Sequence, residues 1–581
     1  MGQQDSKSND QYLNSHHYSG WEIVKLYWQS EFKRNAYLVF TVIVAMTVVL
    51  VVFDVIFSYW FNYFYDALQA YKARSAVILL IIFFVLAFIN IIIAVYRYYI
   101  SQTFGLRWRK WLTEQFIGRW LRNRDYYYLE NFDEYTDNPD QRIQEDIASL
   151  VSISIGLFTG LIASVTTFIG FFYVLWQLSG VMHIHLWGNT VLKIQGYLVW
   201  VAVVYALIGT YFTFKLGYPL VHLNYEQQRR EATFRFAAID LRSHAEHVAL
   251  YRGEDHQKGI LHRLFGNVLD NYYLIIVRQK LLLWFTSGYN QTAVALPLLV
   301  ALPNYFEKIF KLGGLMQSLR AFSSIQDALS FLVNSYTTIA EFRAVTRRLT
   351  NFLNHMQDID AKIAVAGDIK RVEQSTNHIT TRNLSIDMPD GSLLLDKLNL
   401  DLKHGNHYLI KGPSGLGKST FVRTIAGIWP FASGEVLLPA NKNIMYLPQK
   451  PYMPIGTLAE AMLFPDHHTS ENMKMLEQFL RDVRLEHLIP ELNKTASWGE
   501  QLSPGEQQRI AFARVLLQKP DWVFLDESTS MLDLANEEYL YRLLQKQLPN
   551  CSIVSVGHRP SLDVHHNETI DMTDYRALAH A

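Results

Sequence analysis

Residues 412–420 read Gly412-Pro-Ser-Gly-Leu-Gly-Lys-Ser-Thr420 and decide the fold of the C-terminal part of the chain. They match G-x-x-x-x-G-K-[ST], a pattern that joins a strand to a helix in phosphate-binding loops. A strand-like run, residues 407–411, precedes them and a helix-like run, residues 420–427, follows. Glycines let backbone N–H groups turn toward phosphate oxygens, and the helix start adds its positive dipole end. An ordinary glycine-rich turn is the alternative.

This loop supplies the first set of candidate ligand-binding residues. Lys418 is expected to neutralise the β- and γ-phosphates of a nucleotide, and the hydroxyl of Ser419 is expected to bind Mg²⁺. The candidate nucleotide-binding residues of the loop are Gly412, Pro413, Ser414, Gly415, Leu416, Gly417, Lys418, Ser419 and Thr420.

A second stretch, residues 522–527, is an apolar strand that ends in two carboxylates. Asp526 is expected to hold Mg²⁺, and Glu527 to polarise the attacking water. Many buried strands end in aspartate, so this stretch alone does not indicate a metal site. It does so only because the chain also contains a phosphate loop. Together they predict an ATP hydrolase.

A third stretch, Leu502-Ser-Pro-Gly-Glu-Gln507, opens a helix. Ser503 is an N-cap residue type, and with Gly505 it leaves N–H groups for a second anion site. In a head-to-tail dimer this site would close over the γ-phosphate of the partner's nucleotide. Ordinary helix capping is the alternative.

The N-terminal part of the chain carries long apolar runs. Half of the 581 residues are hydrophobic and 18% are charged, against roughly 25% in a soluble globular protein. A membrane span needs about 20 mostly apolar residues. Five runs qualify and a weaker sixth contains Arg320 and Asp327: residues 36–59, 76–96, 155–178, 194–214, 281–305 and 313–340. Asp54, inside the first run, is left open as either a substrate contact or a residue that reaches water.

Topology and loops follow from the charges. Cationic residues gather before the first run and in the loops 97–154 and 215–280, which indicates that these parts lie in the cytosol. ATP is also cytosolic, so both chain ends lie inside and the number of spans is even; we expect six. The two loops are expected to be helical arms, with an inserted globular domain as the alternative.

The remaining organisation is read from composition. Residues 1–20 are expected to be a disordered tail, and residues 21–33 an amphipathic helix on the membrane surface or the start of the first span. Residues 351–376 are expected to be a linker. Strand-like runs at 393–402, 407–411, 435–439, 522–526 and 551–556 predict a largely parallel sheet. A formal net charge of zero argues against nucleic-acid binding, and the single cysteine, Cys551, excludes a disulfide scaffold.

The C-terminal ~220 residues resemble the ATPase domain of ABC transporters, because the LSPGEQ run is similar to that family's signature motif and occurs together with the phosphate loop and the Asp526-Glu527 pair. The resemblance implies that Gln449 contacts Mg²⁺ and the membrane domain, that Asp533 ends the D-loop, and that His558 is the switch histidine beside the γ-phosphate. It completes the candidate sites. Glu527 and His558 are catalytic; Gln449, Ser503, Gly505, Gln507 and Asp533 also bind nucleotide; Ser419, Gln449 and Asp526 bind Mg²⁺. The aromatic residue that stacks on adenine in the family is missing near Met388.

The membrane part is similar to subfamily D, the peroxisomal fatty-acyl half-transporters, and to their bacterial SbmA/BacA-like and YddA-type relatives. The stretches that carry this resemblance are residues 136–143, 231–235, 246–254, 313–317 and 339–343. It implies a multi-domain chain: an all-α transmembrane domain of six helices (21–350), the linker, and an α/β P-loop ATPase domain (377–581). Coupling helices are expected near 126–146 and 246–254.

A half-transporter has one ATPase domain, so the resemblance implies a dimer, most simply a homodimer, in the bacterial inner membrane. We expect an ATP-driven transporter of a peptide or a bulky hydrophilic compound such as cobalamin, with import as one direction. The alternatives are transport of acyl-CoA or another lipid, and a membrane-anchored ATPase with a regulatory role.

Overall fold

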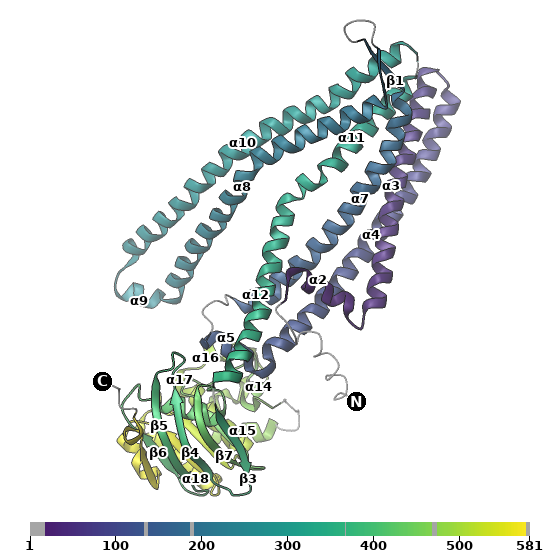
Figure 1. The fold of residues 1–581 in the computed structure, drawn as a ribbon. Helices are drawn as coiled ribbons and strands as arrows, with labels where there is room; N and C mark the ends of the chain where they lie inside the picture. The colour runs from purple at the N-terminus through teal and green to yellow at the C-terminus, as the bar shows by residue number, and fades with distance from the viewer. Residues whose placement is uncertain are drawn as a thin grey trace. The chain divides into compact units, whose positions relative to one another are not determined.

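The computed structural model describes residues 18–132, 138–185, 191–308, 310–366, 368–466 and 473–576. It divides the chain into two compact units, residues 1–357 and residues 358–581 (Figure 1). Most of the expected disordered tail, residues 1–17, lies outside the described residues.

The first unit is built from long helices, as the apolar runs predict. The longest are α3 (Lys33–Gln69), α4 (Ala73–Leu121), α7 (Ile147–Ser179), α8 (Tyr197–Ser243), α10 (Glu254–Phe306), α11 (Leu312–Asn334) and α12 (Tyr336–Ala366). Side chains of α7, α8 and α11, among them Phe171, Leu198 and Phe322, form a buried apolar cluster. The helical N-terminal fold is therefore confirmed.

Within the described residues, four helical segments are long and apolar enough to cross a membrane: Lys33–Gln69, Ala73–Phe132, Pro139–Ser179 and Tyr197–Ser243. The fifth expected span, 281–305, lies inside α10, and the sixth is divided at Ser335 between α11 and α12. Both are helical but less apolar, because they contain amides or charged side chains such as Asn290, Gln291 and Arg320. The number six therefore stays a prediction.

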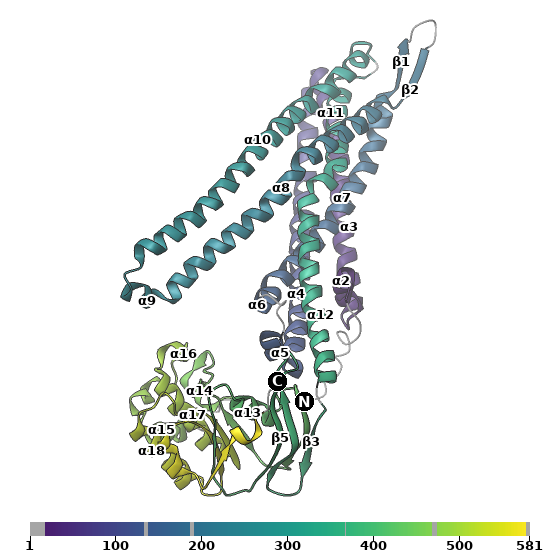
Figure 2. The ribbon, with the colours of Figure 1, turned by 60° about the vertical axis from the view of Figure 1, so that its left-hand side comes forward.

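Where the structure describes them, the two long loops are helical apart from short turns, at Asn138 in the first loop and at His244 and residues 251–253 in the second. The first continues α4 and turns through α5 (Asp125–Phe132), α6 (Pro139–Gln141) and the π-helical turn η2 (Arg142–Asp146). In the second, α8 and α10 run side by side and α9 (Ala245–Leu250) joins them (Figures 1 and 2). Short helices thus lie where coupling helices were expected.

A separate helix precedes the first span. In α2 (Gly20–Gln29) the residues Ile23, Val24, Leu26 and Tyr27 are buried. The ring of Tyr27 stacks on Trp108 of α4, with 5.6 Å between centroids. The N-terminal apolar stretch is therefore a distinct helix packed on the helical unit, and it ends before α3 begins.

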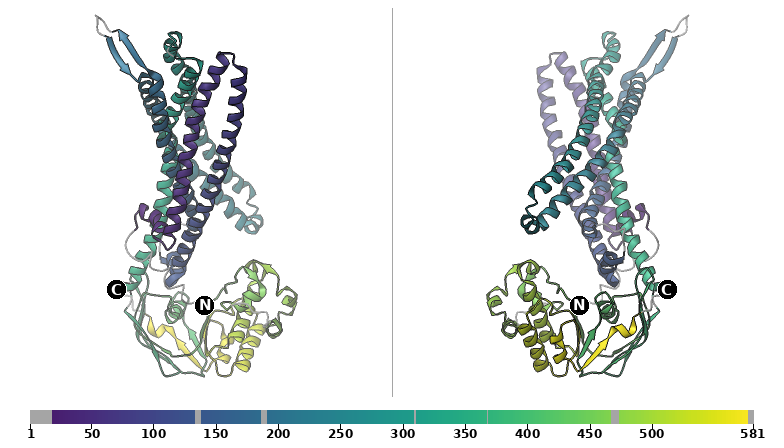
Figure 3. Two further views of the ribbon diagram at one scale, coloured as in Figure 1. Left: turned by 90° about the vertical axis from the view of Figure 1, so that its right-hand side faces the viewer. Right: turned by 90° about the vertical axis from the view of Figure 1, so that its left-hand side faces the viewer.

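The sequence analysis missed a β-hairpin. Strands β1 (Val181–His185) and β2 (Val191–Gln195) pair antiparallel and project beyond the helices (Figure 3). The expected fourth span began at residue 194, but residues 194–195 belong to β2 and α8 begins at Tyr197. Apolar residues at the end of a strand had been counted with the helix that follows.

The second unit contains two larger sheets. The parallel sheet has the order β13 (Glu568–Asp571), β6 (Tyr408–Lys411), β12 (Ser552–Val556), β11 (Trp522–Asp526) and β8 (Ile444–Leu447). The mixed sheet has the order β3 (Ile369–Gln374), β7 (Ala432–Pro439), β4 (Ile379–Asp387) and β5 (Leu393–Leu402).

The expectation of one largely parallel sheet was wrong for two of its five strands. The runs 393–402 and 435–439 lie in the mixed sheet, where β4 pairs antiparallel with both β5 and β7. A short turn containing Gly391, with φ 84°, joins β4 to β5, and so short a connection forces antiparallel pairing. The stretch 351–376, expected as a linker, is the end of α12 followed by β3.

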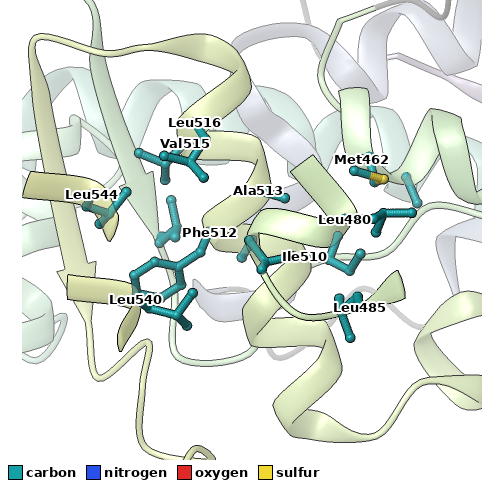
Figure 4. Close-up of a cluster of buried hydrophobic side chains, with 14 of the residues drawn as sticks. Met462, Leu480, Leu485, Ile510, Phe512, Ala513, Val515, Leu516, Leu540 and Leu544 are labelled. Carbon is teal, nitrogen blue, oxygen red and sulfur yellow. The ribbon is translucent and has the colours of Figure 1, made fainter. Parts of the chain in front are cut away.

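Helix α17 (Pro504–Gln518) runs through the core of the second unit. Its side chains Ile510, Phe512 and Val515 pack among Met462, Leu480 and Leu540 from α14 (Leu458–Leu463), α15 (Met473–Asp482) and α18 (Leu534–Gln547) (Figure 4). This packing fixes the start of α17, where the LSPGEQ stretch lies.

Candidate functional site

The phosphate loop has the strand–loop–helix context that its sequence predicts. β6 ends at Lys411, and α13 (Lys418–Ala426) begins at the loop's lysine. Gly412, Gly415 and Gly417 have φ values of 147°, 81° and 98°, a region that side chains rarely tolerate. A Cβ on Gly417 would lie 2.6 Å from Leu394 Cδ2. The backbone conformation therefore favours glycine there, and a Cβ would also have to displace the Leu394 side chain.

Lys418 is buried and folds back over the loop. Its Nζ donates hydrogen bonds of 2.9 Å to the carbonyl oxygens of Gly412 and Pro413. Burial lowers the pKa of Lys418, while the nearby carboxylates of Glu527 and Asp526 act in the opposite direction. The loop therefore presents one ammonium group at its centre.

Ser419 and Asp526 meet beside the loop. The Ser419 hydroxyl donates a 2.9 Å hydrogen bond to Asp526 Oδ1 at the end of β11. Burial raises the pKa of Asp526, against the opposing effect of the Ser419 hydrogen bond. A hydroxyl and a carboxylate next to a phosphate loop match the few protein oxygens that Mg²⁺ uses when phosphates supply its other ligands.

Glu527 lies between two further predicted residues. Gln449 Nε2 donates a 3.0 Å hydrogen bond to Glu527 Oε2, and His558 Nε2 lies 3.8 Å from Glu527 Oε1. Glu527 has φ 46°, and its N–H bonds to the carbonyl of Val556 on β12 at 3.1 Å. The fold thus holds this carboxylate in a backbone conformation that few residues other than glycine adopt.

The LSPGEQ residues form a separate group. Ser503 caps α17, and Glu506 accepts hydrogen bonds from the Ser503 N–H at 2.9 Å and hydroxyl at 2.7 Å. Gln507 is buried, and its amide donates 2.9 Å hydrogen bonds to the carbonyls of Gly499 and Leu502. The side chain of Gln507 supports the turn before the helix, and its expected contact with nucleotide stays a prediction. No hydrogen bond of the described residues joins Ser503, Gly505 or Gln507 to the phosphate loop of the same chain.

Asp533 and Met388 lie at exposed positions. Asp533 caps α18 by accepting a 2.7 Å hydrogen bond from the Asn536 N–H, and that bond lowers the pKa of Asp533. Met388 lies in the turn between β4 and β5 and is partly exposed. Neither contacts the Glu527 group through a described hydrogen bond.

The sequence analysis missed two residues that connect these groups. Gln508 donates a 3.1 Å hydrogen bond to the Gln449 carbonyl, and its side-chain oxygen accepts a 3.1 Å bond from the Met531 N–H. Arg559 donates to the carbonyls of Ser530 at 2.7 Å and Leu532 at 2.9 Å. Each directly follows a predicted residue, Gln507 or His558, and that adjacency was the only signal available.

Comparison with known proteins agrees with this geometry. Residues 23–306 match the family model "ABC transporter transmembrane region 2", and residues 395–530 match the model "ABC transporter". An uncharacterized ABC transporter ATP-binding protein of Haemophilus influenzae is 36% identical, over 92% of this chain and 89% of its own length. The chain belongs to the ABC transporter family.

Two further relatives narrow the branch of the ABC transporters. The inner membrane ABC transporter ATP-binding protein YddA of Escherichia coli is 32% identical, over 93% of this chain and 94% of its own. ABC transporter D family member 2 of Arabidopsis thaliana, a chloroplastic protein, is 28% identical over 95% and 85%. The predicted relation to subfamily D and YddA is therefore confirmed. One membrane region and one ATPase region in one chain make it a half-transporter, which binds ATP and couples ATP hydrolysis to transport.

Proposed function

We propose that this half-transporter works as a homodimer that holds two ATP molecules between its two ATPase domains. The observation that carries the proposal is the separation, within one chain, of the phosphate loop from the LSPGEQ helix start. Each is an anion-binding arrangement, and no described hydrogen bond links the two. In a homodimer, the phosphate loop of one copy would face the LSPGEQ helix start of the second copy, so that both anion-binding arrangements contact the same nucleotide.

In this proposal each site residue has one task. Lys418 and the loop N–H groups bind the phosphates, while Ser419 and Asp526 hold Mg²⁺, which offsets charge on the phosphate oxygens. Glu527 accepts the proton of the attacking water, and His558 and Gln449 keep its carboxylate in place. Ser503 and Gly505 face the partner's γ-phosphate, and Asp533 lies beside them.

We propose a peptide or a bulky hydrophilic compound, such as cobalamin, as the cargo. A cavity of about 490 Å³ between α4 and α7 supports contact with a polar part of the cargo, although it is too small to enclose all of it. It is lined by Ser101, Gln102, Arg109, Ser149, Ser152 and Thr159 among others, which is more polar than a typical ligand pocket. Transport of acyl-CoA or another lipid is the competing outcome.

The test is reconstitution in liposomes with ATP outside. Cobalamin, proline-rich peptides and acyl-CoA would each be screened for stimulation of ATP hydrolysis and for ATP-dependent movement. Glu527→Gln keeps the size of the side chain and should abolish turnover while ATP still binds. Near-normal hydrolysis in that variant contradicts the role of Glu527, and movement of acyl-CoA alone replaces the proposed cargo.

We also propose that the helical unit spans the bacterial inner membrane six times. Both termini and the ATPase domain then lie in the cytoplasm, where ATP is available. Cys551 is buried and should not react with a membrane-impermeant thiol reagent. Labelling would therefore come from a cysteine that is introduced at another position. Lys72→Cys should react from outside the cell, and Arg242→Cys only after the cell is opened. The reverse pattern contradicts the proposed topology.

A further inference from the structure

A groove of about 530 Å³ lies where α2, the start of α3 and the middle of α4 meet. These three helices contact one another in pairs (Figure 1). Its lining includes Val39 of α3 and, on α4, Ile100, Phe104, Arg107 and Lys110. The groove is separate from the polar cavity between α4 and α7, with which it shares no lining residue.

The stripe that α4 presents to the groove changes character along the helix. Ile100 and Phe104, one turn apart, are apolar, and Arg107 and Lys110 follow at the next turns of the same face. With a rise of 1.5 Å per residue, Ile100 and Lys110 lie about 15 Å apart along the axis. The uncharged run 76–96 ends directly before Arg97, one turn from Ile100, and the cationic end of the groove lies further along the helix. The groove thus runs from apolar to charged in the direction in which α4 leaves the bilayer.

Exposed aromatic side chains place the apolar end at the depth of the lipid headgroups. Tyr37 of α3 and Tyr98 and Tyr99 of α4 are 58%, 64% and 65% exposed. Tyrosine gathers where the membrane meets water, because its ring is apolar and its hydroxyl polar. The groove therefore opens toward lipid at the height at which a phospholipid changes from acyl chain to headgroup.

The cationic end is incompletely neutralised by the protein. Arg107 makes no ion pair within the part of the chain that the structure describes. Lys110 lies 3.7 Å from Glu114, but both side chains are largely exposed, and such pairs contribute little. Glu114 is the only acid in the lining, against two cations. Tyr27 from α2 also lines this end, close enough that the charge of Arg107 counteracts the burial that raises the pKa of Tyr27.

We propose that this groove binds one anionic phospholipid, with its phosphate at Arg107 and Lys110 and an acyl chain along Ile100, Phe104 and Val39. The site is a resident lipid site that holds α2 against α3 and α4, and it is distinct from the path of the transported compound. Charge and apolarity both select the ligand: a soluble anion lacks the chain, and a zwitterionic lipid lacks the net charge.

The experiment titrates the delipidated full-length protein in detergent with phosphatidylglycerol or with phosphatidylcholine. Native mass spectrometry counts the lipid molecules bound to each chain. The wild type should bind one phosphatidylglycerol per chain with a preference of about tenfold or more over phosphatidylcholine, because Arg107 and Lys110 attract its net negative charge. A tenfold preference corresponds to about 1.4 kcal/mol. Arg107→Gln with Lys110→Gln should remove that preference. The matched control, Lys33→Gln with Arg34→Gln, removes the same charge from exposed residues outside the groove and should retain it.

Three further arms keep the proposal open to refutation. Ile100→Trp fills the apolar end of the groove and should weaken phosphatidylglycerol binding while both cations remain. This variant tests the lipid site even if the Arg107 and Lys110 double variant does not fold. Glycerol phosphate should not displace the lipid. Glu527→Gln should lose ATP hydrolysis yet bind the lipid as the wild type does, so failure of the motor and failure of the lipid site are distinguishable. Equal binding of the two lipids by the wild type, unchanged binding in the double variant or in Ile100→Trp, or displacement by glycerol phosphate overturns the proposal.

Discussion

An ion pair in the helical unit leads to a quantitative prediction about α12, the helix from which the chain continues into the ATPase unit. Asp146 ends the π-helical turn before α7 and is buried, with 5% of its side chain exposed. It accepts hydrogen bonds from Arg348 of α12, at 2.9 Å from Nε and 2.5 Å from Nη2, and from Arg142 at 2.9 Å. The segment before α7 and α12 are therefore joined by a two-pronged arginine–carboxylate contact. The hydrogen bond that Arg348 donates to Asp146 is the main reason that the pKa of Arg348 is raised.

The magnitude follows from the unequal burial of the partners. Contacting residues in one ion-pair network couple by about 0.5–3 kcal/mol. The contact is bidentate and its carboxylate is buried, but the Arg348 side chain is 41% exposed, so we place the coupling at about 2 kcal/mol within that range. Arg348→Gln leaves Asp146 buried with one arginine and should cost about 2 kcal/mol. Asp146→Asn should cost a similar amount, and the double variant little more than either single one.

The assay is a double-mutant cycle of the Asp146 and Arg348 variants. Thermal unfolding of each purified protein is monitored by circular dichroism. A loss of 2 kcal/mol should lower the Tm by roughly 4–8 °C on the scale of domains of 150–250 residues. The neighbouring Arg347 is exposed, so Arg347→Gln is the matched control and should stay within about 0.5 kcal/mol of wild type. Equal effects of Arg348→Gln and Arg347→Gln, or strictly additive effects of the two Asp146–Arg348 substitutions, refute the reasoning.

Three more predictions concern the ATPase unit. Arg559→Ala removes the donor that holds the carbonyls of Ser530 and Leu532, so ATP hydrolysis should fall about tenfold or more while a fluorescent ATP analogue still binds; unchanged hydrolysis would contradict this. Gly417→Ala should strongly weaken nucleotide binding in the same analogue assay, because the φ of 98° strains any side chain and a Cβ would have to displace Leu394. Binding at wild-type affinity would show that the loop can relax. Although burial alone would raise it, hydrogen bonds from Ser503 and His487 keep the pKa of Glu506 below its ordinary value. Its stabilising effect should be present above the unfolded pKa of about 4.3 and be lost as the pH falls through the lower folded pKa, so that the Tm difference between wild type and Glu506→Gln disappears in that range; a difference that persists would sink the assignment.

The sequence predicted the parts of the fold that depend on local pattern. An apolar run of spanning length is predicted to be a helix from its own residues, and α3, α4 and α7 contain the runs expected for them. The phosphate loop was predictable for the same reason, since its glycines and Lys418 are contiguous. The β1–β2 hairpin was missed because its strands are only five residues long and mix apolar with polar residues. In the sequence such short segments look like the polar end of a membrane span.

Strand pairing and bridging side chains were beyond reach. β5 and β7 read as strands correctly, but a sequence does not state that both lie in a mixed sheet with β4. Gln508 and Arg559 act through carbonyl oxygens far along the chain, and backbone acceptors leave no mark on the residue types that supply them. The sites that could be predicted are those whose chemistry requires particular side chains in a fixed spacing.

The position of Gln449 connects the Glu527 carboxylate to the segment that ends at Asp533. Its side chain donates to Glu527, while its own carbonyl accepts from Gln508, whose amide oxygen in turn holds the Met531 N–H. A displacement of residue 449 therefore acts on the group proposed to polarise water and on the segment that ends at Asp533 through one continuous set of hydrogen bonds. Arg559 fixes the same segment from the other side, directly after His558. Because hydrogen bonds weaken steeply with distance and angle, the Glu527 carboxylate can be held correctly only when residue 449, the D-loop and the His558 segment are all in register.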